Sequence, residues 1–168
     1  KYVATYTLVE GAVDGTNLNV SATMTDNAGN VTTTSDTTNA TVDTQSPSGL
    51  VAGDISIGGA SGTGGAYKVG DTVTAVVDDA NFANLDSGSV SVDFSAFGGS
   101  ASVAASLAVG GANDGKYVAT YTLVEGAVDG TNLNVSATVT DNAGNVQTVT
   151  DTTNATVDTQ SPTLTAAD

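Results

Sequence analysis

An internal repeat constrains this chain more than any other feature of its sequence. Residues 1–47 recur almost unchanged at 116–162, a period of 115 residues. The two copies differ at only four pairs of positions, which are Met24/Val139, Thr32/Gln147, Thr34/Val149 and Ser35/Thr150. Because solenoid units are much shorter, at roughly 20–50 residues, the repeat indicates a tandem array of whole domains.

Proline marks the boundary between repeats. Pro47 and Pro162, the two prolines of the chain, each follow the sequence Val-Asp-Thr-Gln-Ser. Proline lacks a backbone N–H and restricts the residue before it, so it interrupts strands. We therefore expect residues 1–45 to be the C-terminal part of one repeat, 46–160 to be a complete repeat, and 161–168 to begin the next. A unit of this size can bury a core of its own.

Apolar and polar residues alternate through the complete repeat, and this period of two predicts strands rather than helices. Val135 and Val139, for example, would share one face of a strand with Ala137 between them. Seven strands (A–G) are expected, at about 51–57, 73–77, 90–96, 101–109, 117–123, 133–140 and 146–157. A change of parity between Val146 and Val149 predicts a bulge in the seventh.

Seven short strands separated by turns predict an all-β, immunoglobulin-like antiparallel β-sandwich, with another sandwich topology as the alternative. Residues 1–45 would then carry the last three strands, E–G, of the preceding repeat. These strands lack partners for their apolar face. We expect them to pair with another chain, as in a strand-swapped contact, to pair with the complete repeat of a neighbour, or to remain partly disordered.

The charged residues exclude several classes of function. The chain has 18 acidic residues and three lysines, a net charge of −15, and no Arg, His, Cys or Trp. It would repel nucleic acids and anionic membranes, and it lacks the histidine and cysteine of common catalytic triads and zinc sites. We therefore expect no enzyme activity, no nucleic-acid partner and no membrane insertion. Oxygen-ligated cations remain, above all Ca²⁺.

The order of the strands predicts where the carboxylates gather. The loops at 78–86, 113–114 and 141–145 would share the N-terminal end of the repeat, and the turn at 125–129 would lie at the opposite end, beside the exit to the next repeat. In a tandem array, the acidic exit of one repeat would face the acidic loops of the next. Two carboxylates ~4 Å apart repel by about 1 kcal/mol in water and about 4 kcal/mol at an effective dielectric of ~20. We expect Ca²⁺ to bridge this joint.

Several acidic residues are candidate ligands for that metal, and some have a simpler explanation. The candidates are Glu10, Asp14, Asp26, Asp43, Asp78, Asp79, Asp114, Asp141 and Asp158. Asp26 and Asp141 open the loop Asp-Asn-Ala-Gly-Asn, in which Asp and Asn commonly close a turn without any metal. Other carboxylates have simpler expected roles: Asp71 belongs to a turn, and Asp36, Asp54 and Asp151 are surface charge, with a part in a joint as the alternative for Asp54.

Three segments resemble bacterial immunoglobulin-like repeats. They are Asp-Gly-Lys-Tyr-Val-Ala-Thr-Tyr-Thr (114–122), Asn-Val-Ser-Ala-Thr-Val-Thr-Asp-Asn-Ala-Gly-Asn (134–145) and Ala-Thr-Val-Asp-Thr-Gln-Ser-Pro (155–162). The resemblance is to the extender region of giant calcium-dependent RTX adhesins, of the ice-binding and biofilm type. It implies type I secretion, display at the bacterial cell surface, and Ca²⁺ at joints that stiffens the array. It also implies that Asp43, Asp141 and Asp158 are ligands.

Two main functions follow from this reading. The first is a structural extender, a spacer whose partners are neighbouring repeats of the same chain. The near-identical copies favour it, because a spacer needs repetition rather than a unique site. The alternative is a module of a secreted protein that binds carbohydrate, ice or a host protein. Carbohydrate binding usually needs exposed aromatic residues, and the chain has five Tyr and three Phe.

Overall fold

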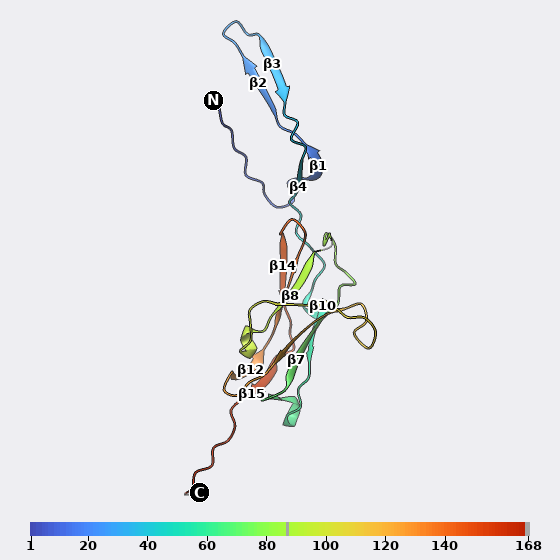
Figure 1. Cartoon of the computed structure of the whole chain (residues 1–168), viewed down its shortest axis with the longest axis vertical. Coiled ribbons are helices and arrows are strands. Elements are labelled where there is room, and N and C mark those ends of the chain that lie inside the picture. Colours follow the sequence, from blue (N-terminus) through green and yellow to red (C-terminus); the bar gives the residue numbers. More distant parts are fainter. Residues whose placement is uncertain (87, 167–168) are drawn as a thin grey trace. The chain divides into compact units, whose positions relative to one another are not determined.

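The chain forms two compact units, Lys1–Ser46 and Pro47–Asp168, in the computed structural model, which describes residues 1–86 and 88–166 (Figure 1). Regular structure in the described residues is almost entirely β, apart from the short 3₁₀ turns η1 (Ala52–Asp54), η2 (Thr63–Gly65) and η3 (Ser95–Phe97). The expected all-β class is therefore confirmed. No helix in the described part of the chain is long and apolar enough to cross a membrane.

The second unit is built from three small sheets. The first has the order β10-β11-β7-β5, made of Ser106–Leu107, Tyr117–Thr122, Thr72–Val77 and Ile55–Gly58. The second has the order β14-β13-β8-β9, made of Val146–Thr150, Ser136–Thr140, Ser89–Asp93 and Val103–Ala104. The third has the order β12-β15-β6, made of Asp129–Leu133, Ala155–Asp158 and Tyr67–Lys68. Every pairing is antiparallel except that of β15 with β6.

The core lies where the apolar faces of these sheets meet. Val73, Ala75 and Val77 on β7 are fully buried, and the residues between them along the strand are more exposed. β8 and β13 show the same alternation, which confirms the period-two prediction. Phe94 and Phe97, at the turn after β8, are fully buried in the same cluster. Burial of apolar area on alternate positions therefore fixes which face of each strand points inward.

The described part of the second unit has eleven short strands, of which β6 lies outside the seven expected ranges and β12 almost entirely outside them. The fourth expected strand is divided because β9 pairs with β8 and β10 pairs with β11, so this edge segment passes from one sheet to another. The seventh is divided between β14 and β15. The sixth corresponds to β13, and β12 is an additional strand that begins at Asp129, where a turn was expected. The first begins later than expected, since residues 52–54 form η1 and Val51 is exposed.

The bulge predicted between Val146 and Val149 is wrong. β13 and β14 pair without a register shift from Thr140↔Val146 to Ser136↔Thr150. The chain instead leaves the strand conformation after Thr150, and Asn154 takes a positive φ of 56° before β15 begins. Asparagine tolerates this left-handed backbone better than other residues with a side chain.

The first unit repeats part of this arrangement. β1 (Asp14–Leu18) pairs with β4 (Ala40–Asp43), and β2 (Ser21–Thr25) pairs with β3 (Val31–Ser35). Both registers are those of the second copy, position for position. The N-terminal residues 1–9 belong to no strand and run as a coil in Figure 1. The assignment of 1–45, 46–160 and 161–168 to successive repeats stays a prediction.

Candidate functional site

Three acidic loops meet at one end of the second unit. They follow β7, precede β11 and follow β13, and their described residues include 78–86, 108–116 and 141–145. Lys116 bonds to Asp78 across the first two loops, and the Asn142 side-chain amide donates to the Asp86 carbonyl across the first and third. The strand order therefore brings Asp78, Asp79, Asp114 and Asp141 to the same end of the unit.

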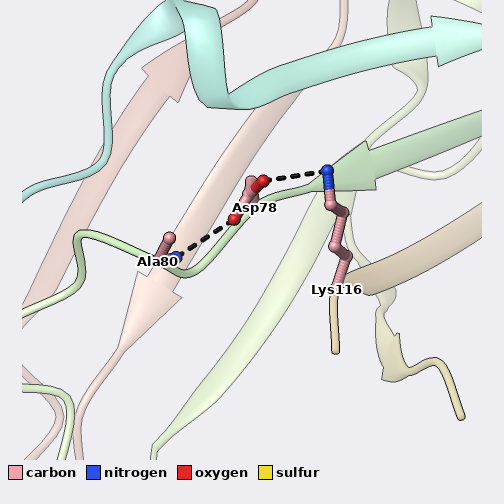
Figure 2. Close-up of polar contacts among 3 residues, drawn as sticks. All are labelled: Asp78, Ala80 and Lys116. Atoms are coloured by element: carbon pink, nitrogen blue, oxygen red, sulfur yellow. Dashed lines mark hydrogen bonds and ion pairs between the residues drawn. The ribbon is translucent and has the colours of Figure 1, made fainter. Parts of the chain in front are cut away.

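Asp78 at this end is paired with a lysine. Its Oδ2 lies 2.9 Å from Lys116 Nζ, and its Oδ1 accepts a 3.1 Å hydrogen bond from the Ala80 N–H (Figure 2). The bond from Lys116, followed by the one from Ala80, lowers the pKa of the Asp78 carboxyl. The strand register explains this pair: Tyr117 is the antiparallel partner of Val77, so residues 116 and 78 are neighbours.

The Asp141 carboxylate accepts hydrogen bonds from residues of its own loop. Its Oδ1 accepts N–H groups of Gly144 at 2.8 Å and Asn145 at 2.9 Å, and its Oδ2 accepts the Asn145 side-chain amide at 2.8 Å. Burial alone would raise the pKa of Asp141, but these hydrogen bonds outweigh it and lower the pKa. Asp26 accepts the same two bonds from Asn30 and a third from the Ala28 N–H, and its pKa is lowered as well, first by the Asn30 side chain. The turn explanation therefore accounts for both residues.

The remaining candidates at this end have separate surroundings. Asp114 Oδ1 accepts a 2.6 Å hydrogen bond from the Gly110 N–H, which closes the turn before β11. Asp79 is half-buried, and its backbone carbonyl accepts the Phe82 N–H. Among the residues that the structure describes, neither carboxylate belongs to a group of three possible metal ligands.

At the other end, acidic residues face each other across strand pairs. Asp129 is the cross-strand partner of Asp158, and Asp14 is the partner of Asp43 in the first unit. Like charges directly opposite in an antiparallel pair are destabilising. Lys68 lies beside Asp158 on the parallel strand β6. In the described part of the first unit, β4 pairs only with β1, so no lysine takes the equivalent place.

The chain leaves the second unit through an exit segment, Thr159–Pro162, that is tied to the preceding turn. Glu125 Oε1 accepts the Ser161 N–H at 2.9 Å, and Oε2 accepts the Ser161 hydroxyl at 2.7 Å. The Thr159 hydroxyl accepts the Val128 N–H at 2.9 Å and donates to the Val128 carbonyl. We call these four bonds the exit clamp. The Ser161 N–H, then its hydroxyl, lower the pKa of Glu125.

The first unit has the same exit clamp. Glu10 accepts the Ser46 N–H at 2.8 Å and the Ser46 hydroxyl at 2.9 Å. The Thr44 hydroxyl accepts the Val13 N–H at 3.0 Å and donates to the Val13 carbonyl at 2.6 Å. The role found for Glu10 is thus a hydrogen-bonded anchor of the backbone. Sequence reasoning missed it, although Glu and Ser recur at a fixed separation of 36 residues in both copies.

The arrangement of these carboxylates can be compared with the ligands that Ca²⁺ requires. Ca²⁺ takes roughly 6–8 oxygen ligands. Among the described residues, no three His, Cys, Asp or Glu side chains gather as a metal-binding group. Asp43 and Asp158 also accept hydrogen bonds from the N–H groups of Gln45 and Gln160. Within the described residues, the candidate carboxylates therefore do not form a cluster of three, and most of those described above accept hydrogen bonds from nearby backbone or side-chain donors or pair with a lysine.

Two aspartates that were expected to be peripheral have structural roles. Asp151, expected as surface charge, is 2% exposed; its carboxylate accepts the N–H groups of Val135 at 2.8 Å and Thr153 at 3.0 Å. Asp71 lies in a turn as expected, but it is buried. Its carboxylate accepts hydrogen bonds from the N–H and the hydroxyl of Ser61. The surface-charge prediction for Asp151 is wrong, because this carboxylate serves backbone donors where the strand breaks.

Asp36 and Asp54 also contact backbone donors. Asp36, the counterpart of Asp151, is exposed and accepts the Val20 N–H at 2.9 Å. Asp54 is half-buried and accepts the Val51 N–H at 2.9 Å, which closes η1. Carboxylates that cap local backbone are thus common in this chain.

Comparison of the chain with protein-family models, with curated proteins and with solved structures found no match.

Proposed function

We propose that the chain is a structural extender, a series of small β-domains that holds other parts of a longer protein apart. The observation that carries this proposal is the exit clamp, which occurs in both copies with the same four bonds. A flexible tether needs no such contacts. A spacer does, because the direction in which the chain leaves each domain must be fixed if length is to add from one domain to the next.

The strand order supports the finer fold proposed for each repeat. The orders β10-β11-β7-β5 and β14-β13-β8-β9 correspond to strands D-E-B-A and G-F-C-D of the seven expected. An immunoglobulin-like sandwich of the constant type has A, B, E and D in one sheet and C, F and G in the other. In this proposal the strand D segment contributes to both sheets, and β6 and β15 extend the exit end.

The rigidity of the exit segment tests the extender proposal. We expect the amides of Gln160 and Ser161 to show ¹⁵N relaxation as restricted as that of β15. Replacing Glu125 with Ala removes both acceptors and should make these amides mobile on the nanosecond timescale. Glu125→Gln is the matched control, because its amide can still accept from the Ser161 N–H and donate to its hydroxyl. Amides that are already mobile in the unaltered chain would refute a fixed exit.

We further propose that Ca²⁺ completes the joint between repeats, as the resemblance to extracellular adhesin extenders implies. The support is electrostatic: Asp14 faces Asp43 across a strand pair, directly before the boundary, and the net charge of −15 leaves few cations to balance them. Millimolar CaCl₂ should raise the melting temperature and the radius of gyration relative to EDTA, and MgCl₂ at equal ionic strength should do less.

A matched pair of variants separates calcium binding from general screening. Asp43→Asn should reduce the calcium response, whereas Asp36→Asn removes the same charge from the same unit and should leave the response intact. A melting temperature and a radius of gyration that do not change on removal of calcium would refute the bridged joint. The extender proposal would survive that result if the exit segment is rigid without metal.

A further inference from the structure

The chain enters the second unit through an entry segment, residues 47–50, that is fastened to two parts of this unit. Ser48 bridges Ala83 in the loop after β7, and the N–H of each residue donates to the carbonyl of the other at 2.9 Å. Two residues further on, Leu50 is 2% exposed and belongs to the hydrophobic core. The entry segment is therefore part of the folded unit.

The side chain of Gln147, on β14, pairs with Leu50 in the way that a neighbouring strand would. Its Oε1 accepts the Leu50 N–H at 3.1 Å, and its Nε2 donates to the Leu50 carbonyl at 3.0 Å. A primary amide can make both bonds because it carries a donor and an acceptor side by side. β14 is the edge strand of one sheet, and the entry segment leads to β5, the edge strand of another. We call the Ser48–Ala83 bridge and the two Gln147–Leu50 bonds the entry clamp.

Gly49 lets the entry segment lie against the loop after β7. Its φ is 98°, a backbone conformation that glycine adopts easily. A Cβ at this position would lie 1.9 Å from the carbonyl oxygen of Asn81. Any other residue would therefore push the segment away from the loop and open the entry clamp.

The two clamps leave little of the connecting chain without contacts. Glu10 holds the N–H and the hydroxyl of Ser46 within the first unit, and Ala83 holds Ser48 within the second. Only Pro47 lies between these two held residues, and its ring restricts φ to about −65°. The freedom of the connection therefore depends on a few backbone torsions, and it increases if the entry clamp opens.

The two copies of the repeat differ at the residue that makes the Leu50 contact. All four differences between them fall on one hairpin, β2–β3 in the first copy and β13–β14 in the second. Thr32 stands in the first copy where the second has Gln147. The threonine hydroxyl is attached to Cβ, much closer to the backbone than the glutamine amide, and it cannot reproduce the paired bonds. The hairpin register is the same in both copies.

We propose that Gln147 is a positioning residue that sets the stiffness of the joint before its own repeat. A repeat with glutamine at this position fixes its entry segment and narrows the range of directions open to the preceding unit. A repeat with threonine, as at Thr32, leaves the joint before it looser. This inference rests on the proposed extender function, and it makes the stiffness of each joint depend on one side chain as well as on any bound cation.

Hydrogen exchange tests the contact itself. Gln147→Met keeps a side chain of similar length and removes both hydrogen bonds, so the Leu50 amide should exchange about tenfold faster. Gln147→Thr, the residue of the first copy, should have the same effect. Gln160→Met makes the same replacement at an exposed glutamine of the exit segment and should leave Leu50 unchanged. Unchanged exchange in β13 shows that the fold is intact, and Gly49→Ala opens the clamp without altering β14.

A pair of spin labels tests the joint. The chain has no cysteine, so Thr37→Cys and Thr152→Cys place one label on each unit at equivalent exposed positions. The distribution of label-to-label distances is measured in EDTA, so that no cation contributes. We expect a narrow distribution in the otherwise unaltered chain, its loss in Gln147→Met and in Gly49→Ala, and its retention in Gln160→Met.

The outcomes separate this inference from the extender proposal. Leu50 exchange that does not change in Gln147→Met would overturn the inference, and so would a distance distribution that stays narrow although the Leu50 amide has become exposed. If either result occurs while the Gln160 and Ser161 amides are restricted, the extender proposal still stands. Mobile Gln160 and Ser161 amides, together with the expected changes at Leu50, would refute the extender and support the entry clamp alone.

Discussion

Val139 and Met24 occupy the same position of the repeat and differ in burial, so they form a natural pair for measuring the core. Val139→Ala removes two methyl groups from a buried site and leaves a cavity, which should cost about 2 kcal/mol of unfolding free energy. Met24→Ala removes a larger side chain from an exposed site and should change stability by a few tenths of a kcal/mol. Urea denaturation followed by methyl signals of each unit measures both. Equal effects would contradict the difference in burial between the two positions.

Asp151 and Asp36 form a second matched pair. Both accept the backbone N–H at the same position of the repeat, but only Asp151 is buried. Asp151→Ala leaves the buried Val135 N–H unsatisfied and should destabilise the second unit by about 1–3 kcal/mol, whereas water can reach the exposed Thr153. Water replaces the lost acceptor in Asp36→Ala, so that change should be nearly neutral. Thermal unfolding of both variants tests the comparison, and a neutral Asp151→Ala would contradict the anchoring role.

The sequence predicted the burial of some residues and missed the roles of others, and the reason is geometric. The alternation of apolar residues predicted which side chains of β7, β8 and β13 are buried, because burial repeats every two residues. Asp151 lies where that period breaks, so nothing in the pattern showed which way it points. Lys116 was missed because its role depends on a register between strands about 40 residues apart, which alternation within one strand does not reveal.

At the scale of elements, the exit segment should respond to acid. Glu125 has a lowered pKa, so its bonds to Ser161 contribute fully at pH values above the ordinary carboxyl pKa of 4.5. The contribution is lost as the pH falls through the lower, folded pKa, because protonation removes a charged acceptor. The Ser161 amide should therefore become mobile only in that acid range, as followed by ¹⁵N relaxation. In Glu125→Gln its mobility should not depend on pH, and a transition that persists in this variant would assign the change to another carboxylate.

The division of the expected strands also belongs to this scale. Asn132 and Asn154 both have positive φ, as do Asn17 and Asn39 in the first copy. The register of β12 with β15 shifts between Gly130 and Leu133, around Asn132. Asn154 reads as an ordinary polar strand residue in the sequence, so the alternation predicted one strand over 146–157 where the structure has β14 and β15. The all-β class depended on burial alone and was not affected.

For the whole molecule, charge is the property that acts at the longest range. Eighteen acidic residues and three lysines leave an excess of 15 negative charges, and only one ion pair, Lys116–Asp78, joins described residues. That pair is partly exposed, and exposed pairs contribute about 0–1 kcal/mol. Repulsion within the folded state should therefore exceed attraction, and it includes the direct opposition of Asp129 and Asp158.

Monovalent salt should consequently stabilise the second unit. The Debye length falls from ~30 Å at 0.01 M to ~8 Å at 0.15 M ionic strength, so distant carboxylates cease to repel each other. We expect the melting temperature in EDTA to rise by a few degrees over this range of NaCl. Asp129→Asn should melt higher at low salt and gain less from added salt, because one opposed pair is already removed. Since salt also weakens the Lys116–Asp78 pair, a melting temperature that falls with NaCl would show that this attraction, and not repulsion among carboxylates, dominates the electrostatics of the fold.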